Sequence, residues 1–434
     1  MTHSAARPDY QHETQEGEAT LYDGIAFDDY PGGGVHQASP LWTGTRGTGT
    51  VMPSQLPQPA ASSDARTDGS LYLRSLIRQC ERMTAQSVTD VSWPGGSGRD
   101  SFQARLANGS SVVVTRRETA ERALLEERVL THLGAAGAPV PEVIGFNGIV
   151  LVQSDAGGER LSNCLHASPG TAARDLPAAI ESLLRIHQAG RDSGLAGVVP
   201  LLGADADWVR GLIDRPAVLG AYLDVTAPVP DLDGLFDLLM LTDPAFVKWD
   251  SRPGNCASRP DQDAVWFDWE HCGARNGLDD LVWLLCDEFM VDAPRLEAEL
   301  IVEFAGHFSD EPAEVVRHYL AAAGVLHMCV RLSLILSEAE NDGWGTTASC
   351  VRDDSVGSSP RLAARLCARA ARWSDSAPQT AALAPWFERI GGEITRRAAP
   401  PDYAVARPQA PEPEFSLSGH FVAEASAGWR VSAA

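Results

Sequence analysis

The sequence predicts an α+β protein with two unequal parts, a small β-sheet unit with one helix and a larger, mainly helical unit. Three observations support this prediction. Short strand-like runs gather between residues 93 and 154, amphipathic helical patterns dominate residues 155–399, and a lone hairpin pattern lies among those helices at 246–273. At 434 residues the chain is too long for one compact core and long enough for two or three units.

The N-terminal unit follows a segment of biased composition. Residues 1–68 are rich in Gly, Pro, Ser, Thr and Gln and show no apolar period, which predicts a disordered tail or linker. From residue 69 onward LYLRSLIRQCERM has helical spacing. The runs SFQARLA and SVVVTR meet at Asn108-Gly109, a dipeptide favoured in hairpins. A helix over 118–137 and the strand GIVLVQS complete a unit with expected bounds 69–154.

The C-terminal unit is expected to span residues 155–399. DLPAAIESLLRIHQAG, LDDLVWLLCDEFMV and the later segments carry apolar stripes at helical spacing. Residues 400–434 read as a Pro-rich tail. The segment FVKWDSRPGNCASRPDQDAVWFDW interrupts the helices with two apolar runs joined by turn residues, and each run ends at or near an aspartate. This segment holds most of the functional signal.

Bulk composition limits the classes of partner. The chain is 44% hydrophobic and 21% charged, as expected for a folded protein. Its formal charge of −23 disfavours nucleic acids and anionic membranes as partners. No apolar run approaches the ~18 residues of a membrane span, and the first residues lack a secretory-signal pattern. We therefore expect a cytoplasmic protein; the sequence leaves its oligomeric state open.

Eight cysteines are scattered along the chain without any C-x-x-C pair. Cys256 and Cys272 flank the hairpin and could be read as metal ligands, but neither has a C-x-x-C partner. Reduced, buried thiols are the expected state.

Asp250, Asn255 and Asp268 form the pattern D-x-x-x-x-N, then a strand, then Asp. Phosphoryl transfer from ATP or GTP needs these groups: one carboxylate accepts the proton of the attacking hydroxyl, while an amide oxygen and a second carboxylate hold Mg²⁺. Hairpin strands lie only about 5 Å apart, which would bring Asn255 and Asp268 together. The alternative is that Asp250 and Asn255 only cap turns. The strand, aspartate and helix that follow them favour a phosphotransfer site.

Several ordered motifs resemble the aminoglycoside phosphotransferase and choline kinase group of the protein-kinase-like superfamily. VKWDSRPGN resembles the family's catalytic loop H-G-D-x-x-x-x-N, and VWFDWEHCG resembles its metal-binding segment I-D-W/F-E-x-A-x-x-G. LLRIHQAG resembles the family's L-x-x-L-H helix, and EERVLTHLGAAGAPVPEVIG and IVLVQSDAGGERL resemble its helix-to-hinge region. The resemblance implies a two-lobed, protein-kinase-like fold.

The same resemblance implies roles for individual residues. Asp250 would be the catalytic base, and Asn255 and Asp268 would bind Mg²⁺. Glu126 would pair with a basic residue on the preceding strand. The nucleotide would contact the hinge and the loop PGGSGRDS, whose candidate residues are Gln153, Ser154, Gly96 and Ser97.

Two departures from the family pattern stand out. Lys248, the one lysine of the sequence, replaces the usual His two residues before the base; it either brings positive charge near the phosphates or points to solvent. The strand SVVVTRR has no lysine, so Arg116 is the candidate for phosphate contact, with Arg117 behind it. Arginine keeps the charge but changes the reach and hydrogen-bond geometry.

Other residues have structural interpretations. His187 reads as a core histidine, and Asp280 as a helix cap that braces the catalytic loop. Glu270 either helps at the metal or faces solvent. The core is expected to take the tryptophans near the hairpin, one of which could floor the substrate cleft: Trp249, Trp266, Trp269 and Trp283.

The resulting hypothesis is a phosphotransferase that moves the γ-phosphate of ATP or GTP to a hydroxyl of a small molecule. The acidic chain favours an amine-bearing acceptor such as an aminoglycoside, bound by the helices after Asp280. The alternative is a catalytically degraded nucleotide-binding or interaction module, suggested by the two departures. A protein kinase is disfavoured because no A-P-E segment or long activation loop lies between Asp268 and the helix that begins near Asp280.

Overall fold

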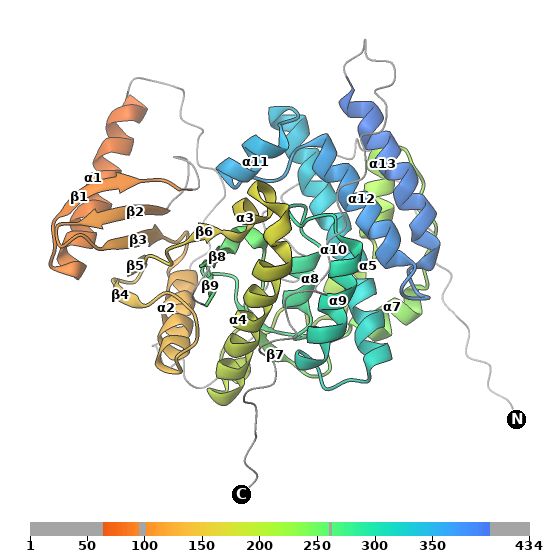
Figure 1. Cartoon of the computed structure of the whole chain (residues 1–434), viewed down its shortest axis with the longest axis horizontal. Helices are drawn as coiled ribbons and strands as arrows, with labels where there is room; N and C mark the ends of the chain where they lie inside the picture. Colours follow the sequence, from red (N-terminus) through yellow and green to blue (C-terminus); the bar gives the residue numbers. More distant parts are fainter. Residues whose placement is uncertain (1–63, 95–100, 260–262, 400–434) are drawn as a thin grey trace, which may run out of the picture.

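The computed structural model describes residues 64–94, 101–259 and 263–399 (Figure 1). The expected tail at 400–434 and the loop residues Gly96 and Ser97 lie outside this part of the chain. Helix α1 begins at Asp64, within the segment 1–68 that the sequence predicts to be a tail or linker; residues 1–63 of that segment also lie outside the described part of the chain. The N-terminal sheet and the larger helical part form the predicted α+β, two-lobed architecture (Figure 1).

The N-terminal lobe is a five-stranded antiparallel sheet with the order β1-β2-β3-β5-β4. The strands β2 and β3 form the hairpin expected from Asn108-Gly109, and Gly109 has the positive φ of 87° that such a turn requires. The elements of this lobe are α1 Asp64–Thr84, β1 Val88–Ser92, β2 Ser101–Leu106, β3 Ser111–Arg116, α2 Ala120–Ala135, β4 Val143–Phe146 and β5 Val150–Ser154.

The two faces of this sheet have different neighbours. Val112 and Val114 of β3 are buried in one core with Leu76 of α1. Because side chains alternate along a strand, Val113 and Thr115 point to the opposite face, where they line the main cavity of the molecule. Arg117 lies just beyond the end of β3, two positions after Thr115, and therefore lines the cavity as well.

Helix α2 joins the small lobe to the large one. Its N-terminus is capped by Thr119, whose side chain accepts a hydrogen bond from the backbone N–H of Arg122 at 3.3 Å. Its buried residues Val129, Leu130 and Leu133 belong to the same core as the helices of the large lobe. This packing fixes the position of the buried Glu126 on α2 relative to the β8–β9 hairpin of the large lobe.

The C-terminal lobe consists mainly of helices packed around α10 (Figure 1). Two small sheets belong to this lobe, in the orders β6-β8-β9 and β10-β7. The elements are β6 Glu159–Arg160, α3 Leu161–Ala167, α4 Ala172–Asp192, α5 Ala206–Ile213, α6 Arg215–Leu223, α7 Leu232–Leu239, β7 Ala245–Val247, β8 Cys256–Ser258, β9 Val265–Trp266, β10 Gly273–Arg275, α8 Asp279–Leu285, α9 Pro294–Phe304, α10 Ala313–Asp342, α11 Thr347–Asp353, α12 Pro360–Ser374 and α13 Ala384–Ala398.

Helix α10 is, among the described residues, the one helix long and apolar enough to cross a membrane, with a window of mean hydropathy 1.8. The expectation that no apolar stretch reaches this length is therefore wrong. However, 89% of that window is buried inside the protein. Such burial is typical of the central helix of a folded lobe.

The cysteines behave as the sequence predicts, since all eight are free thiols and none is exposed. Burial raises the pKa of the Cys256 and Cys272 thiols, so both stay protonated at neutral pH. Within the described residues, no group of three or more His, Cys, Asp or Glu side chains is arranged to hold a metal ion.

Candidate active site

The predicted catalytic loop follows strand β7 with an unusual backbone. Trp249 and Asp250 have φ values of 50° and 60°, in the left-handed region that non-glycine residues seldom adopt. The Asn255 amide Nδ2 then donates to Asp250 twice, to Oδ2 at 2.7 Å and to the main-chain oxygen at 3.0 Å. The other carboxylate oxygen, Asp250 Oδ1, is buried and has no hydrogen-bond partner within the described chain. This oxygen is available to an incoming group.

Asp280 holds this strained loop in place from the start of helix α8. Its carboxylate accepts the backbone N–H groups of Lys248 at 2.8 Å and Trp249 at 2.9 Å, and the Ser251 hydroxyl at 3.1 Å. The ring Nε2 of His187, which is only 2% exposed, lies 2.7 Å from the same carboxylate. The expectations that Asp280 braces the loop and that His187 is a core residue are confirmed. The expectation that Asp280 caps its helix is wrong, because the N-cap of α8 is Leu278 and the Asp280 carboxylate is bound to the loop instead.

The predicted metal-binding aspartate follows β9. The backbone N–H of Phe267 donates to the main-chain oxygen of Asn255 at 3.0 Å, which extends the antiparallel β8–β9 pairing to the next residue. Asp268 then adopts φ 63°, again left-handed. The hairpin thus brings Asn255 and Asp268 to one cavity, as its turn residues predicted.

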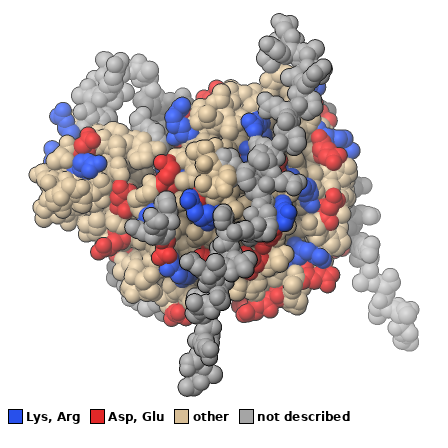
Figure 2. All heavy atoms as spheres, in the orientation of Figure 1, with Lys and Arg blue, Asp and Glu red and all other residues tan. Residues whose placement is uncertain are grey.

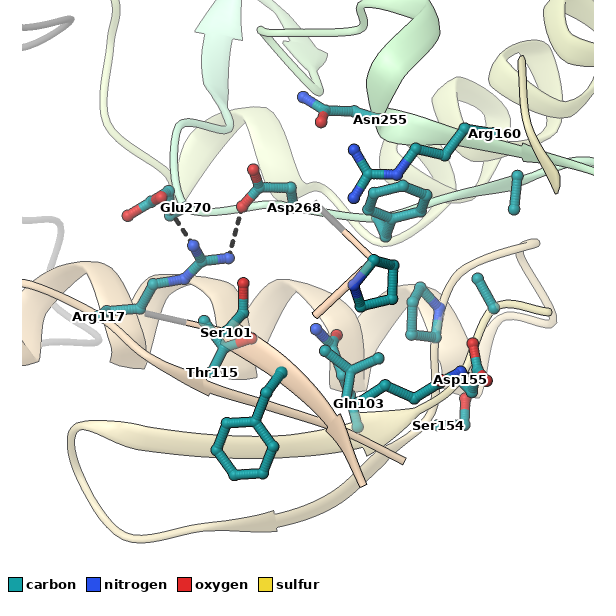
Figure 3. A pocket seen from close by; sticks show the side chains of 18 of the residues that line it. Ser101, Gln103, Thr115, Arg117, Ser154, Asp155, Arg160, Asn255, Asp268 and Glu270 are labelled. Atoms are coloured by element: carbon teal, nitrogen blue, oxygen red, sulfur yellow. Dashed lines mark hydrogen bonds and ion pairs between the residues drawn. The ribbon is translucent and has the colours of Figure 1, made fainter. Parts of the chain in front are cut away.

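Arg117 pairs with three carboxylates, and Figure 3 shows two of these pairs, those with Asp268 and Glu270. Its Nε and Nη2 form a bidentate pair with Glu126, at 2.6 and 2.7 Å. The same guanidinium reaches Asp268 at 2.6 Å and Glu270 at 2.7 Å. Glu126 is fully buried and also accepts the backbone N–H of Trp269 at 3.1 Å. One arginine therefore ties helix α2 to the metal-binding segment.

The basic residue that meets Glu126 is Arg117, which the sequence placed behind Arg116. Strand parity explains this pairing, because Val112 and Val114 face α1, whereas Val113 and Arg117 face the cavity. Arg116, the residue expected from the sequence to contact phosphate, also lines the cavity, and its guanidinium lies 6.0 Å from the centre of the Tyr72 ring.

The charges around Arg117 shift the pKa values of its partners. Burial raises the pKa of the Asp268 carboxyl, but the positive charges of Arg117 and Lys248 outweigh this effect and hold the pKa below its usual range. Burial raises the pKa of Glu270; Arg117 opposes this change and the negative charge of Asp268 adds to it. Asp268 is therefore a carboxylate at neutral pH, as a metal ligand must be.

The cavity between the two lobes has a volume of about 500 Å³. On the sheet side it is lined by Gln103, Val113, Gln153 and Ser154, and on the helical side by Arg160, Ala257 and Phe267 (Figure 3). Its size and its position at the junction of two lobes are typical of a ligand-binding site.

Gln153 and Ser154 lie at the end of β5, where the chain leaves the sheet, as predicted for a hinge. Two hydrogen bonds join Ser154 to Glu142, the residue just before β4. The backbone N–H of Ser154 donates to the main-chain oxygen of Glu142 at 2.8 Å, and the backbone N–H of Glu142 donates to Ser154 Oγ at 2.9 Å. The side-chain oxygen of Gln153 is buried without a hydrogen-bond partner in the described part of the chain. The hinge therefore offers an unused acceptor to a ligand.

Lys248 occupies a place that the sequence did not indicate. It is fully buried, so the interpretation that it points to solvent is wrong. Its Nζ donates to the main-chain oxygen of Asp250 at 3.1 Å and to that of Asp268 at 2.9 Å. Glu270 is likewise not a free surface residue, because it is partly buried and paired with Arg117.

The tryptophans near the hairpin are mostly core, as predicted. Trp266, Trp269 and Trp283 are at most 2% exposed. Trp249 is only partly buried and lies against Trp208 and Trp283, with ring centres 6.3 and 5.4 Å apart. These rings line a second cavity of about 20 Å³, room for about one water molecule.

The comparisons with known proteins agree with this geometry. The sequence profile of the phosphotransferase enzyme family matches residues 93–317, which is more than half of the chain. The protein therefore belongs to this family, a class of phosphotransferases. The match begins at the sheet and runs through the catalytic loop and the metal-binding segment.

Solved structures similar to the chain have low sequence identity. One is a choline/ethanolamine kinase family protein from Mesorhizobium loti, with 18% identity and a TM-score of 0.44, covering 76% of this chain and 99% of that one. A putative aminoglycoside phosphotransferase from Ralstonia eutropha has 15% identity and a TM-score of 0.44, with the same coverages of 76% and 99%. A putative fructosamine-3-kinase from Thermobifida fusca has 19% identity and a TM-score of 0.40, covering 67% and 99%. No curated protein sequence matches the chain significantly.

Proposed function

We propose that this protein transfers the γ-phosphate of ATP or GTP to a hydroxyl group of a small molecule in a Mg²⁺-dependent reaction. The observation that carries the proposal is that Asn255 and Asp268 line one two-lobed cavity that also reaches the hinge at Gln153, while Asn255 is hydrogen-bonded to Asp250 at 2.7 Å. A nucleotide base at the hinge would place its phosphates toward Asp268.

The residues fit a magnesium ion. Asn255 uses its Nδ2 to hold Asp250, which leaves its Oδ1 as a ligand atom, and Asp268 is an ionised carboxylate with 32% of its side chain exposed. Both provide the hard oxygen ligands that Mg²⁺ prefers, and Mg²⁺ commonly takes only one or two protein ligands besides phosphate and water. Bound there, the ion would neutralise charge on the phosphate oxygens.

Asp250 is the residue we assign to the proton. The acceptor hydroxyl would donate its hydrogen bond to Oδ1, the carboxylate oxygen left without a partner. As the hydroxyl oxygen bonds to the γ-phosphorus, the bond from that phosphorus to the bridging oxygen breaks, ADP or GDP leaves, and the hydroxyl proton passes to Asp250. Asn255 and Asp280 keep the carboxylate and its loop oriented during this step.

For the acceptor we propose an amine-bearing hydroxyl compound, a class that includes the aminoglycosides. The net charge of −23 supports a cationic acceptor. On the face shown in Figure 2, acidic side chains are distributed over both lobes and interspersed with basic ones.

The first test is calorimetry of ATP and GTP binding with and without Mg²⁺, on the wild type and on Asp268→Ala. We expect binding that strengthens with Mg²⁺ in the wild type and no metal-dependent gain in the variant. Aminoglycosides, amino alcohols and sugars are then screened for acceptor-dependent release of ADP or GDP. A folded wild type that binds neither nucleotide at millimolar concentration would contradict the proposal.

The alternative is a catalytically degraded nucleotide-binding or interaction module. It is favoured by one observation, the occupation of Arg117 by three carboxylates, which leaves this guanidinium little capacity for a phosphate. The same experiment separates the two functions. Nucleotide binding that is indifferent to Mg²⁺, with no acceptor that releases ADP or GDP, would support the degraded module.

A further inference from the structure

Lys248 is the only lysine in a sequence that otherwise uses arginine for its basic side chains. It is fully buried between the catalytic loop and the metal-binding segment. An ammonium group removed from water is unfavourable unless hydrogen bonds replace its hydration. A sole lysine at such a place therefore calls for a physical reason.

The contacts of the ammonium group give that reason. Nζ donates to two main-chain oxygens, those of Asp250 and Asp268, and lies 5.4 Å from the centre of the Trp269 ring. The residues that supply these oxygens lie 18 positions apart in the sequence. Both have left-handed backbones, with φ values of 60° and 63°. One side chain thus binds the main chain at the two strained residues that carry the candidate base and the candidate metal ligand.

We propose that Lys248 is a positioning residue that fixes the catalytic loop and the metal-binding segment in one relative arrangement, by bonding the main-chain oxygens of Asp250 and Asp268 with a single ammonium group. This inference rests on the proposed function of the two aspartates. Lys248 itself would touch neither the nucleotide nor the acceptor.

Lysine suits this task better than the histidine usual in the family. An ammonium group has three donors that can serve two carbonyl groups and still face an aromatic ring, whereas a neutral imidazole has one N–H donor. The positive charge also acts on Asp268, since it contributes to holding the pKa of that carboxyl low. Position and charge thus come from one residue.

The test separates positioning from general support of the fold. The nucleotide AMP-PNP is titrated with and without Mg²⁺ into the wild type, Lys248→Met and Lys248→His, and the ratio of the two Kd values measures the metal-dependent gain. We expect Lys248→Met to lower this ratio about tenfold or more while the Kd without metal changes less than about threefold. Lys248→His restores part of the ratio, because its one N–H can serve one of the two carbonyl groups.

Arg369→Met is the matched control. Arg369 is a buried cation that also donates to main-chain oxygens, those of Asp287 at 3.2 Å and Val291 at 2.6 Å, and it pairs with Glu297. Arg369→Met is expected to lower the melting temperature without changing the ratio of the Kd values measured with and without Mg²⁺. If Lys248→Met also lowers only the melting temperature, the positioning role is overturned.

A second measurement needs no variant. With lysine labelled by ¹⁵N at Nζ, the protein has one side-chain ammonium signal, which slow exchange with water should keep visible for a buried group. We expect saturation with Mg²⁺ and AMP-PNP to shift this signal, because both of its acceptor oxygens belong to residues of the site. A signal that stays unchanged at saturation would overturn the inference. A wild type that shows no metal-dependent nucleotide binding would instead overturn the proposed function, and this role with it.

Discussion

Two groups of charges hold the candidate site, one from each lobe, and they work differently. On the N-terminal side Arg117 meets Glu126, Asp268 and Glu270 through side chains at the edge of the cavity. On the C-terminal side Asp280 and Lys248 are fully buried, and most of their hydrogen bonds go to the main chain. The first group links side chains of the two lobes, whereas the second fixes the backbone of the two loops that carry Asp250 and Asp268.

This difference has a physical basis. The contacts of Arg117 with Asp268 and Glu270 involve carboxylates that are 32% and 17% exposed, so water and salt screen them, whereas its pair with Glu126 is buried. A buried group that satisfies main-chain donors or acceptors cannot be removed without leaving those groups unpaired, which costs about 1–3 kcal/mol for each. The loops are therefore fixed from the large lobe, and Arg117 adds an adjustable link to the small one.

The largest expected effect is on the chemistry itself. Asp250→Asn keeps the shape of the side chain but removes the proton acceptor, so phosphotransfer should fall about a thousandfold. The Kd for Mg²⁺ and nucleotide should change less than about threefold, because Asp250 is not assigned to the metal. Acceptor-dependent ADP or GDP release and calorimetry measure the two quantities. A variant that keeps a tenth or more of the rate would remove Asp250 from the role of base.

Removal of the brace on the large lobe should cost the most stability. Asp280→Ala leaves the backbone N–H groups of Lys248 and Trp249 without their acceptor, and we expect the free energy of unfolding to drop by about 3 kcal/mol. Urea unfolding measures the change. Asp280→Asn, which retains one acceptor oxygen, should lose about half as much. Equal losses in the two variants would contradict the assignment of stability to these hydrogen bonds.

The link on the small lobe is tested by a pair of neighbouring arginines. Arg117→Met should weaken binding of Mg²⁺ and nucleotide about tenfold, because Glu126 and Asp268 lose the cation that orients them. Arg116→Met should change that affinity less than about threefold, since Arg116 lies toward Tyr72. Calorimetry on both variants is the measurement. The opposite ranking would support the phosphate contact that the sequence predicted for Arg116.

The smallest effect is a dependence of stability on pH from a buried carboxyl group of the large lobe. Burial raises the pKa of Asp279 to about 6, although Arg275 opposes the change. A raised folded pKa gives stability that is complete below the unfolded value of about 4 and is lost as the pH rises through about 6. Between about pH 5 and about pH 8 the wild type should lose about 1 kcal/mol of unfolding free energy, and Asp279→Asn should lose less.

Urea midpoints at the two pH values test this sign. Asp207→Asn is the control, because the Asp207 side chain is 91% exposed. The pKa of Asp268 is lowered, so its effect on stability has the opposite dependence on pH. Its stabilising contribution is present at higher pH and is lost only as the pH falls below about 4. A wild type that becomes more stable toward high pH would contradict the prediction for Asp279.

The sequence by itself determined the elements and the local motif. Helical spacing predicted the large lobe, the Asn108-Gly109 turn predicted the β2–β3 hairpin, and the order Asp250, Asn255, strand, Asp268 predicted the two loops of the site. These features depend on turn chemistry and on periods of a few residues, which a sequence displays directly.

Only the tertiary structure decided which charges meet. Arg117, and not its neighbour Arg116, meets Glu126 because the parity of β3 is set by its packing on α1. Lys248 became a buried bridge because two distant loops direct main-chain oxygens toward it. Such contacts depend on how separate elements close on one another, and no local pattern in the sequence records that closure.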